Sequence, residues 1–273
     1  MTGGKFDLER IGGRAALAAL IDEVLEAGQD ALALYRGGAA NRTKRKPDRS
    51  PVTEADQAVE RRLRRFLVER YPDAAFLGEE TGASGPDGSG LRWVVDPIDG
   101  TRAFIRGIPT WSILLGLEAD GEPVVGIAYM PAADDLFVAT RGRGAFCNGR
   151  PLRVSSVESL EDCVVSHGAL SQFTDMSRGE WLPRLARATY TQRGFADFDG
   201  YRQLVLGRVD AMIDPGVAPW DVCAAAVIVR EAGGRFTNVE GEESIHGGTC
   251  FVASNGGVHD ALLGLLSGEP EPG

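Results

Sequence analysis

Apolar residues recur at steps of three and four in several stretches of the chain, and this period predicts amphipathic helices. The first helix is expected over residues 7–35, and Gly37 with Gly38 then ends it. A second helix opens at Thr53, whose hydroxyl can cap it, and stops before Pro72. Three further helices are predicted over 198–206, 220–232 and 258–266. Residues 267–273 form a polar tail that is expected to fray.

Short apolar runs between these helices predict strands. Two of the runs flank Asp120 and Gly121, a dipeptide typical of a β-hairpin. Residues 81–90 are rich in Gly, Ser and Pro and are expected to form a loop. The predicted strands cover 74–77, 93–95, 111–118, 123–130, 136–140, 144–147, 163–166, 188–192, 209–213 and 251–254. This order of helices and strands indicates an α+β fold in which sheets lie between layers of helices.

The composition is that of an ordinary globular protein, with 43% apolar and 25% charged residues among 273. This length suits one large domain or two closely packed ones. The net charge of −10 argues against a broad nucleic-acid-binding surface. No stretch has the pattern of a signal peptide or the length of a membrane span, so we expect a cytoplasmic protein without a membrane partner. The four cysteines show no C-x-x-C spacing, which fits free thiols better than a zinc site.

A basic, polar segment at residues 41–51 shows no apolar period. Five basic residues on an acidic protein are a poor footprint for nucleic acid. A mobile cationic flap that closes on an anionic substrate explains this composition better. A plain solvated loop is the alternative.

Candidate chemistry centres on residues 93–101, where an apolar run leads into the carboxylates Asp96 and Asp99. The run predicts a buried strand that delivers both acids to its end, where α/β folds place their ligands. Pro97 stiffens the backbone between the acids, and Gly100 allows a sharp turn close to a ligand. Two oxygen ligands beside free backbone N–H groups suit a divalent metal that bridges to a phosphate. The alternative is a tight Asp-Gly turn after a core strand.

Further acids lie at the ends of other predicted elements. Asp56 falls in the first turn of the second helix, where it either complements the helix dipole or faces a metal site. Glu79 and Glu80 are adjacent at the end of a predicted strand, an unusual pair for a turn. The acids that would meet in one site are Asp56, Glu79, Asp96, Asp99 and Asp221. Such a cluster of negative charges must take up protons or bind cations.

Four motifs, in their order and spacing, resemble the inositol monophosphatase superfamily of metal-dependent phosphomonoesterases. They are Thr53-Glu54-Ala55-Asp56, Gly78-Glu79-Glu80, Asp96-Pro97-Ile98-Asp99-Gly100-Thr101, and Trp220-Asp221 followed by Glu231-Ala232-Gly233-Gly234. The resemblance covers nearly the whole chain. It implies one phosphatase unit over 1–273, with an N-terminal half at 1–155 and a C-terminal half at 156–273. It also implies a five-layered αβαβα sandwich and a homodimer.

The resemblance implies a role for each matching residue. The implied ligands of two Mg²⁺ ions are Glu79, Asp96, the Ile98 carbonyl, Asp99 and Asp221, and Asp56 would help to hold a third ion. Glu79, Thr101 and Asp56 are the implied catalytic residues, and the first two would orient the attacking water. The backbone N–H groups of Gly100 and Thr101 would bind the phosphate. In-line attack by a metal-activated water suits a reaction that needs up to ~10²¹-fold acceleration. No G-x-S-x-G turn offers a serine nucleophile instead.

Within the superfamily, the chain most resembles the histidinol-phosphate phosphatases. The matching segments are 46–53, 104–111, 193–198 and, more weakly, His246-Gly247-Gly248. Ala196 is a mild departure, because the group commonly has Gly there. The substrate carries an ammonium and an imidazole, so Asp197 and Asp214 are expected to flank it through charge-assisted hydrogen bonds. Arg193 completes the predicted substrate-binding set. The alternative is that Asp197 and Asp199 are ordinary loop or cap acids.

Other functions stay open, either as a different enzyme of the same superfamily or as a non-catalytic binding protein. An inositol-1-phosphate or broad sugar phosphatase has the same motifs, as do relatives that act on 3′-phosphoadenosine nucleotides or fructose bisphosphate. A non-catalytic metal- or phosphate-binding protein would be expected to lack the water-orienting pair, yet Glu79 and Thr101 are both present. A dinucleotide site at Gly142-Arg143-Gly144 is not expected, because Cys147 breaks the G-x-G-x-x-G pattern. The expected partner is therefore a small-molecule phosphate monoester.

Overall fold

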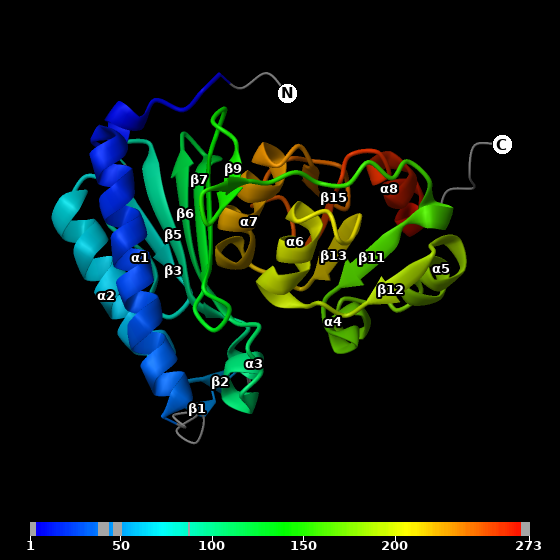
Figure 1. Ribbon diagram of the computed structural model, residues 1–273, viewed down its shortest axis with the longest axis horizontal. Helices are drawn as coiled ribbons and strands as arrows, with labels where there is room; N and C mark the ends of the chain where they lie inside the picture. The colour runs from blue at the N-terminus through cyan, green and yellow to red at the C-terminus, as the bar shows by residue number, and fades with distance from the viewer. Residues whose placement is uncertain (1–3, 38–43, 46–50, 87, 269–273) are drawn as a thin grey trace.

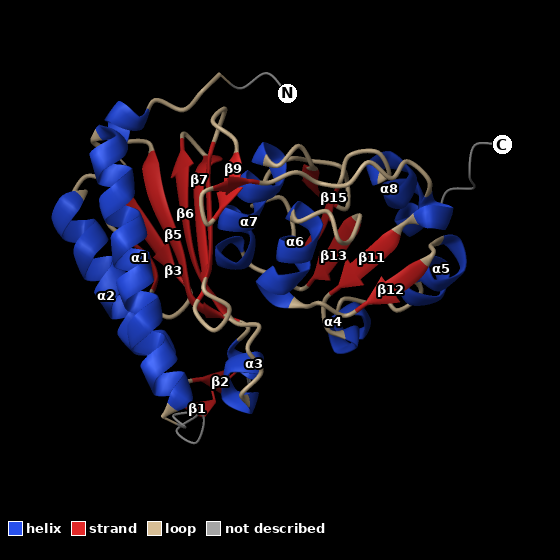
Figure 2. Cartoon of the chain, viewed as in Figure 1, coloured by secondary structure: helices blue, strands red, loops and turns tan. Residues whose placement is uncertain are grey.

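The computed structural model describes residues 4–37, 44–45, 51–86 and 88–268. Two sheets alternate with three layers of helices (Figure 1), and Figure 2 shows the same order by secondary structure. Three apolar clusters fill the spaces between the layers. The predicted five-layered αβαβα sandwich is confirmed.

The first layer holds two long helices, α1 (Gly13–Arg36) and α2 (Glu54–Arg70), which pack on the outer face of the larger sheet. The prediction of one continuous helix over 7–35 is wrong. A short 3₁₀ helix, η1 (Leu8–Ile11), precedes α1, because Gly12 and Gly13 have φ angles of 91° and 77° that a right-handed helix does not accommodate.

The larger sheet has eight strands in the order β10-β9-β8-β7-β6-β5-β3-β4. Only β3 and β5 pair in parallel, and the other neighbours are antiparallel. The strands are β3 (Ala75–Gly78), β4 (Gly82–Ser84), β5 (Leu91–Asp99), β6 (Ser112–Ala119), β7 (Glu122–Met130), β8 (Asp135–Thr140), β9 (Ala145–Cys147) and β10 (Arg150–Pro151). The predicted hairpin at Asp120 and Gly121 is confirmed, whereas β4 lies inside the predicted 81–90 loop.

The middle layer contains α6 (Asp197–Val205) and α7 (Pro219–Glu231), which lie between the two sheets. α7 is apolar on nearly all sides because both of its faces are covered. Gly116 of β6 and Gly126 of β7 let it approach the larger sheet, since a Cβ atom at either position would collide with Cys223 or Ala224. This close packing fixes the position of the helix that begins next to Asp221.

The smaller sheet has five strands in the order β12-β11-β13-β15-β14. They are β11 (Val164–His167), β12 (Thr191–Arg193), β13 (Ala211–Pro215), β14 (Arg235–Asn238) and β15 (Cys250–Ser254). The outer layer that covers it consists of α4 (Leu170–Asp175), α5 (Trp181–Ala188) and α8 (His259–Ser267). α4, α5 and β14 were not predicted, and the strand predicted at 188–192 begins only at Thr191, because Ala188 still belongs to α5.

Every strand of the larger sheet ends by residue 151, and every strand of the smaller sheet begins at residue 164 or later. Between α1 and α2, β1 (Lys44–Arg45) and β2 (Pro51–Val52) form a two-stranded pair. The rest of the 41–51 segment lies outside the described residues, so the cationic flap stays a prediction. No helix in the described ranges is long and apolar enough to cross a membrane.

Candidate active site

The end of β5 brings two acids to one side of the chain. In a regular strand, residues three apart point to opposite faces. The pairing of β5 with β6 shifts register between Asp96 and Asp99, and this irregularity lets both carboxylates reach one place. The Ile98 N–H donates to Asp96 Oδ1 at 3.1 Å, and Asp99 Oδ2 accepts from Ser112 Oγ at 2.8 Å and from the Phe198 N–H at 2.9 Å.

The chain turns directly after Asp99. Gly100 adopts φ = 79°, and a short helix, α3 (Thr101–Arg106), follows. A side chain at Gly100 would meet Asp197 Oδ2 at 3.1 Å, so the glycine permits the close approach of α6 as well as the turn. The first N–H groups of α3 therefore lie at the edge of the acidic site, as the sequence predicted.

α2 contributes Asp56 to a second group of acids. Thr53 caps the helix as predicted, and its N–H donates to Asp56 Oδ2 at 2.8 Å. The Thr101 hydroxyl lies 3.2 Å from Asp56 Oδ1 and 3.0 Å from the Ile98 carbonyl oxygen. Asp56, a capping residue of its own helix, thus also contacts the turn that follows β5.

Glu60, one turn after Asp56 on α2, anchors the turn that carries Glu79. Its carboxylate accepts the N–H groups of Glu80 at 2.7 Å and Thr81 at 2.8 Å, and it is 1% exposed. A Cβ atom at Gly78 would lie 2.6 Å from this carboxylate, so only glycine fits there. The sequence analysis missed Glu60, although an acid on the apolar stripe of an amphipathic helix was the available signal.

Two groups of acids result. Oxygens of Asp96, Asp99 and Asp221 lie within 4.8 Å of one another, and so do oxygens of Asp56, Glu79 and Glu80. Asp221 also caps α7 by accepting the Ala218 N–H at 2.6 Å. Glu80 is a second residue to which sequence reasoning assigned no role.

The electrostatics of the site favour a cation. Burial, followed by the charges of Glu79 and Asp99, raises the pKa of Asp96 well above its usual range. Burial and then Asp197 do the same to the pKa of Asp99, and burial, with Glu79 next among the raising groups, takes the pKa of Asp221 to about 7. Donors that are all oxygen, in a cluster that resists ionising, fit a hard divalent ion such as Mg²⁺.

A pocket of about 300 Å³ adjoins these acids. Its lining includes Asp197 and Asp214, two of the predicted substrate-binding residues, together with Gln172 of α4. Asp197 has φ = 55°, an uncommon conformation outside glycine, and burial raises its pKa. Asp214 is buried and its Oδ2 accepts the Tyr201 hydroxyl at 3.0 Å.

Two other residues singled out in the sequence do not reach this pocket. Arg193 is exposed at the end of β12, and its guanidinium donates to Thr191 Oγ1 at 2.9 Å and to the Gln192 carbonyl at 2.8 Å. His246 Nε2 lies 2.6 Å from Glu118 Oε1, and Glu118 pairs with Arg92 at the start of β5, at the far end from Asp99.

The glutamate of the Glu231-Ala232-Gly233-Gly234 motif has a structural role. Its carboxylate accepts three successive N–H groups, those of Gly142 at 2.7 Å, Arg143 at 3.1 Å and Gly144 at 2.7 Å. The C-terminal end of α7 therefore holds the turn between β8 and β9, whereas its N-terminal end presents Asp221 to the acids of β5.

Comparison with known proteins agrees with this geometry. The model of the inositol monophosphatase family matches residues 14–269. The chain is 41% identical over 244 residues to a histidinol-phosphatase of Mycobacterium tuberculosis, covering 87% of this chain and 93% of that protein. It is 34% identical to a fructose-1,6-bisphosphatase/inositol-1-monophosphatase of Thermotoga maritima, covering 86% and 90%. The crystal structure of the extragenic suppressor protein suhB from Bartonella henselae superposes with a TM-score of 0.85 at 30% identity, covering 92% and 98%.

Proposed function

The chain belongs to the inositol monophosphatase family and is a phosphoric monoester hydrolase, and we propose that it hydrolyses L-histidinol phosphate to L-histidinol and phosphate in histidine biosynthesis. The observation that carries this choice is the pair of carboxylates, Asp197 and Asp214, in the pocket beside the acidic cluster. A substrate with an ammonium and an imidazole offers donors to both. The 41% identity to a histidinol-phosphatase supports the same choice.

We propose that Mg²⁺ occupies the acidic cluster. The residues that would hold two ions are Glu79, Asp96, Asp99, Asp221 and the carbonyl of Ile98, and Asp56 with Glu80 would hold a third. When bound, Mg²⁺ neutralises phosphate charge and makes water more acidic. The raised pKa values of Asp96 and Asp99 reflect the repulsion and desolvation that such ions would relieve.

The protein's own groups position the reactants. The Thr101 hydroxyl, 3.2 Å from Asp56, can donate its single proton to that carboxylate and so accept a hydrogen bond from the attacking water. Glu79, in the turn that follows β3, accepts a hydrogen bond from the same water. The N–H groups of Gly100 and Thr101 bind phosphate oxygens at the start of α3. Asp197 and Asp214 then orient the departing amino alcohol.

The deciding experiment measures phosphate release with Mg²⁺ from L-histidinol phosphate and from inositol-1-phosphate side by side. We expect kcat/KM to favour histidinol phosphate by about a hundredfold, or ~2.7 kcal/mol. Glu79→Gln should abolish turnover of both substrates without changing the circular dichroism spectrum. Retained turnover in that variant would overturn the proposed mechanism.

The second candidate is an inositol-1-phosphate or broad sugar phosphatase, which the 34% identity to the Thermotoga maritima relative favours. Equal rates on the two substrates, or a preference for the cyclitol, would assign it. We also propose that the protein is cytoplasmic, which its four unpaired cysteines support. We propose further that it is a homodimer, which the exposure of large apolar side chains such as Leu170 (58%) and Tyr190 (73%) supports. Light scattering on the purified protein tests the dimer.

A further inference from the structure

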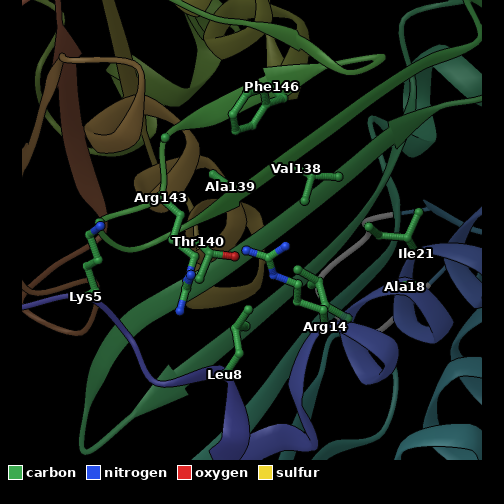
Figure 3. Close-up of a pocket in the computed structure, with 13 residues that line it drawn as sticks. Lys5, Leu8, Arg14, Ala18, Ile21, Val138, Ala139, Thr140, Arg143 and Phe146 are labelled. Atoms are coloured by element: carbon green, nitrogen blue, oxygen red, sulfur yellow. The ribbon is translucent and has the colours of Figure 1, made fainter.

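A second hollow lies away from the acidic site. It has a volume of about 610 Å³ and is lined by the N-terminal segment, the start of α1 and strands β8 and β9. Figure 3 shows it as a space between α1 and the sheet. It shares no lining residue with the pocket at Asp96 and Asp99. The proposed phosphatase chemistry therefore leaves it without a role.

The lining of this hollow is mainly apolar at its floor. Leu8 and Ile21 lie on one side of the floor and Val138 and Phe146 on the other. Phe146 is 39% exposed, a large aromatic surface left in contact with water. Such a floor favours an apolar group of matching size.

Three cations surround the floor: Lys5, Arg14 and Arg143. The guanidinium groups of Arg14 and Arg143 extend into the same space beside Thr140 (Figure 3). None of the described residues that line the hollow is acidic, and no ion pair joins these three cations to a described carboxylate. In a protein of net charge −10, this is a local excess of positive charge.

The groove between α1 and α2 provides a contrast. It also carries three arginines, Arg61, Arg62 and Arg65, but Asp30 lines it as well. Arg62 pairs with Asp30 at 3.0 Å and with two glutamates of α1. The groove thus holds an acid of its own, and its central cation Arg62 is neutralised, whereas none of the three cations of the hollow at Arg14 and Arg143 has such a partner among the residues described.

Hydrogen bonds fix the rim of the hollow in place. Glu231 holds the N–H groups of residues 142–144, and the Phe6 N–H donates to the Arg141 carbonyl at 3.0 Å. Arg143 Nη2 donates to the Phe6 carbonyl at 3.4 Å. These contacts position Arg143 before a ligand arrives, which lowers the entropic cost of binding.

We propose that this hollow binds a small molecule in which an aromatic or branched apolar group carries a carboxylate, sulfonate or phosphate. The volume lies within the usual range for a small-molecule site, roughly 300–1,000 Å³. The apolar group occupies the floor between Ile21 and Phe146, and the anion lies between Arg14 and Arg143. This proposal does not depend on the substrate of the acidic site.

The test uses a matched pair of fluorescent probes. 8-Anilinonaphthalene-1-sulfonate has the required apolar group and anion, and N-phenyl-1-naphthylamine is the same molecule without the sulfonate. We expect one saturable site that binds the sulfonate at least tenfold more tightly than the neutral probe, a difference of about 1.4 kcal/mol. Arg14→Gln with Arg143→Gln should remove that preference.

Two further variants make the test specific. Ala18→Trp fills the hollow from an exposed position of α1 and should abolish binding of both probes. Arg61→Gln with Arg65→Gln removes the same number of positive charges from the groove between α1 and α2, which shares no lining residue with the hollow, and should leave both affinities unchanged. Unaltered sulfonate binding in the Arg14/Arg143 and Ala18 variants would overturn the proposal, and so would a wild-type protein that binds the two probes equally.

Discussion

At the scale of single residues, Asp197 combines three properties that rarely occur together. It carries a carboxyl group whose pKa burial raises, it adopts φ = 55°, and its Oδ2 lies 3.1 Å from the place of a Cβ atom on Gly100. Asp and Asn tolerate this backbone conformation better than other side chains do. The chain therefore accepts local strain in order to place a carboxylate beside the proposed phosphate site.

Asp197→Asn should preserve that backbone and remove only the charge. We expect KM for histidinol phosphate to rise at least tenfold, because one charge-assisted hydrogen bond to the substrate is lost. The kinetics on inositol-1-phosphate should hardly change, and a parallel assay on both substrates checks this. Equal losses on both would show that Asp197 does not select the substrate.

Glu60→Gln should disturb the turn that carries Glu79. The amide group replaces one of the two acceptor oxygens for the N–H groups of Glu80 and Thr81, at a cost of about 1.5–3 kcal/mol. We expect kcat to fall by tenfold or more and the Mg²⁺ concentration needed for half-maximal activity to rise.

Glu69→Gln, on an exposed position of the same helix, is the matched control and should behave as the wild type. A loss of stability in Glu60→Gln with unchanged Mg²⁺ dependence would assign Glu60 a purely structural role.

The acids of the site were predictable because they follow directly from local patterns. Asp96 and Asp99 lie next to an apolar run, Asp56 in a capping box and Asp221 at the start of an apolar helix. Glu60 and Glu80 were missed since their roles arise only when α2 packs against β3. The convergence of Asp96 and Asp99 likewise depends on a register shift that no sequence period reveals.

At the scale of elements, length separates what the sequence predicts from what it does not. The helices α2, α7 and α8 and the paired strands β6 and β7 lie within a few residues of their predicted bounds, and α1 does so at its C-terminal end. α4, α5 and β14 have six, eight and four residues, too few for a period to stand out. α4 and α5 are specified by packing in the outer layer, where Phe173 and Trp181 are buried, and β14 by packing of Phe236 against the middle layer.

His259, at the start of α8, ties that helix to two strands and makes their packing sensitive to acid. Its Nδ1 lies 2.8 Å from Ser254 Oγ of β15, and its Nε2 lies 3.0 Å from Thr237 Oγ1 of β14. Burial, and then the charge of Arg235, lowers its pKa to about 4.

In the unfolded chain the imidazole titrates near 6.5, so between pH 6.5 and 4 the unfolded state binds more protons than the folded one. The contribution of His259 to stability is therefore present above pH 6.5 and falls by about 3 kcal/mol towards pH 4. Urea unfolding at several pH values should show that the free energy of unfolding of the wild type, relative to that of His259→Gln, falls by this amount between pH 6.5 and 4. An equal slope in both proteins would remove His259 as the cause.

At the scale of the whole molecule, the acidic cluster joins parts of the chain that are distant in sequence. Asp56 precedes the larger sheet, Asp96 and Asp99 end β5, and Asp221 begins the helix between the sheets. Cations bound in the two groups of acids would link the first helical layer, the larger sheet and the middle layer. Occupancy of the site is therefore coupled to global stability.

Mg²⁺ should raise the melting temperature, and the rise should be larger at pH 8 than at pH 5.5. Asp221 has a pKa of about 7 in the metal-free fold against 3.8 as its reference value, so the folded state keeps a proton that the unfolded state loses as pH rises. The proton on Asp221 thus makes the metal-free protein lose stability as pH rises towards 7, and at pH 8 Mg²⁺ has no proton to displace from Asp221.

A hundredfold excess over the dissociation constant would contribute about 2.7 kcal/mol. Scanning calorimetry with Mg²⁺ or with EDTA at each pH measures the change in melting temperature. A buffer in which Na⁺ replaces Mg²⁺ at equal ionic strength is the control. A larger rise at pH 5.5 would contradict the proposed ligands.

The lining of the pocket at the acidic cluster is divided between the two sheets. The proposed hydrolytic groups come from the larger sheet and its neighbours, apart from Asp221. Gln172, Asp197 and Asp214 come from the outer layer, the middle layer and the smaller sheet, respectively. Selection can therefore act on substrate preference through positions that leave the hydrolytic groups untouched. Descendants of this protein can therefore acquire new substrates by a few substitutions in the C-terminal half, without first losing the hydrolytic reaction.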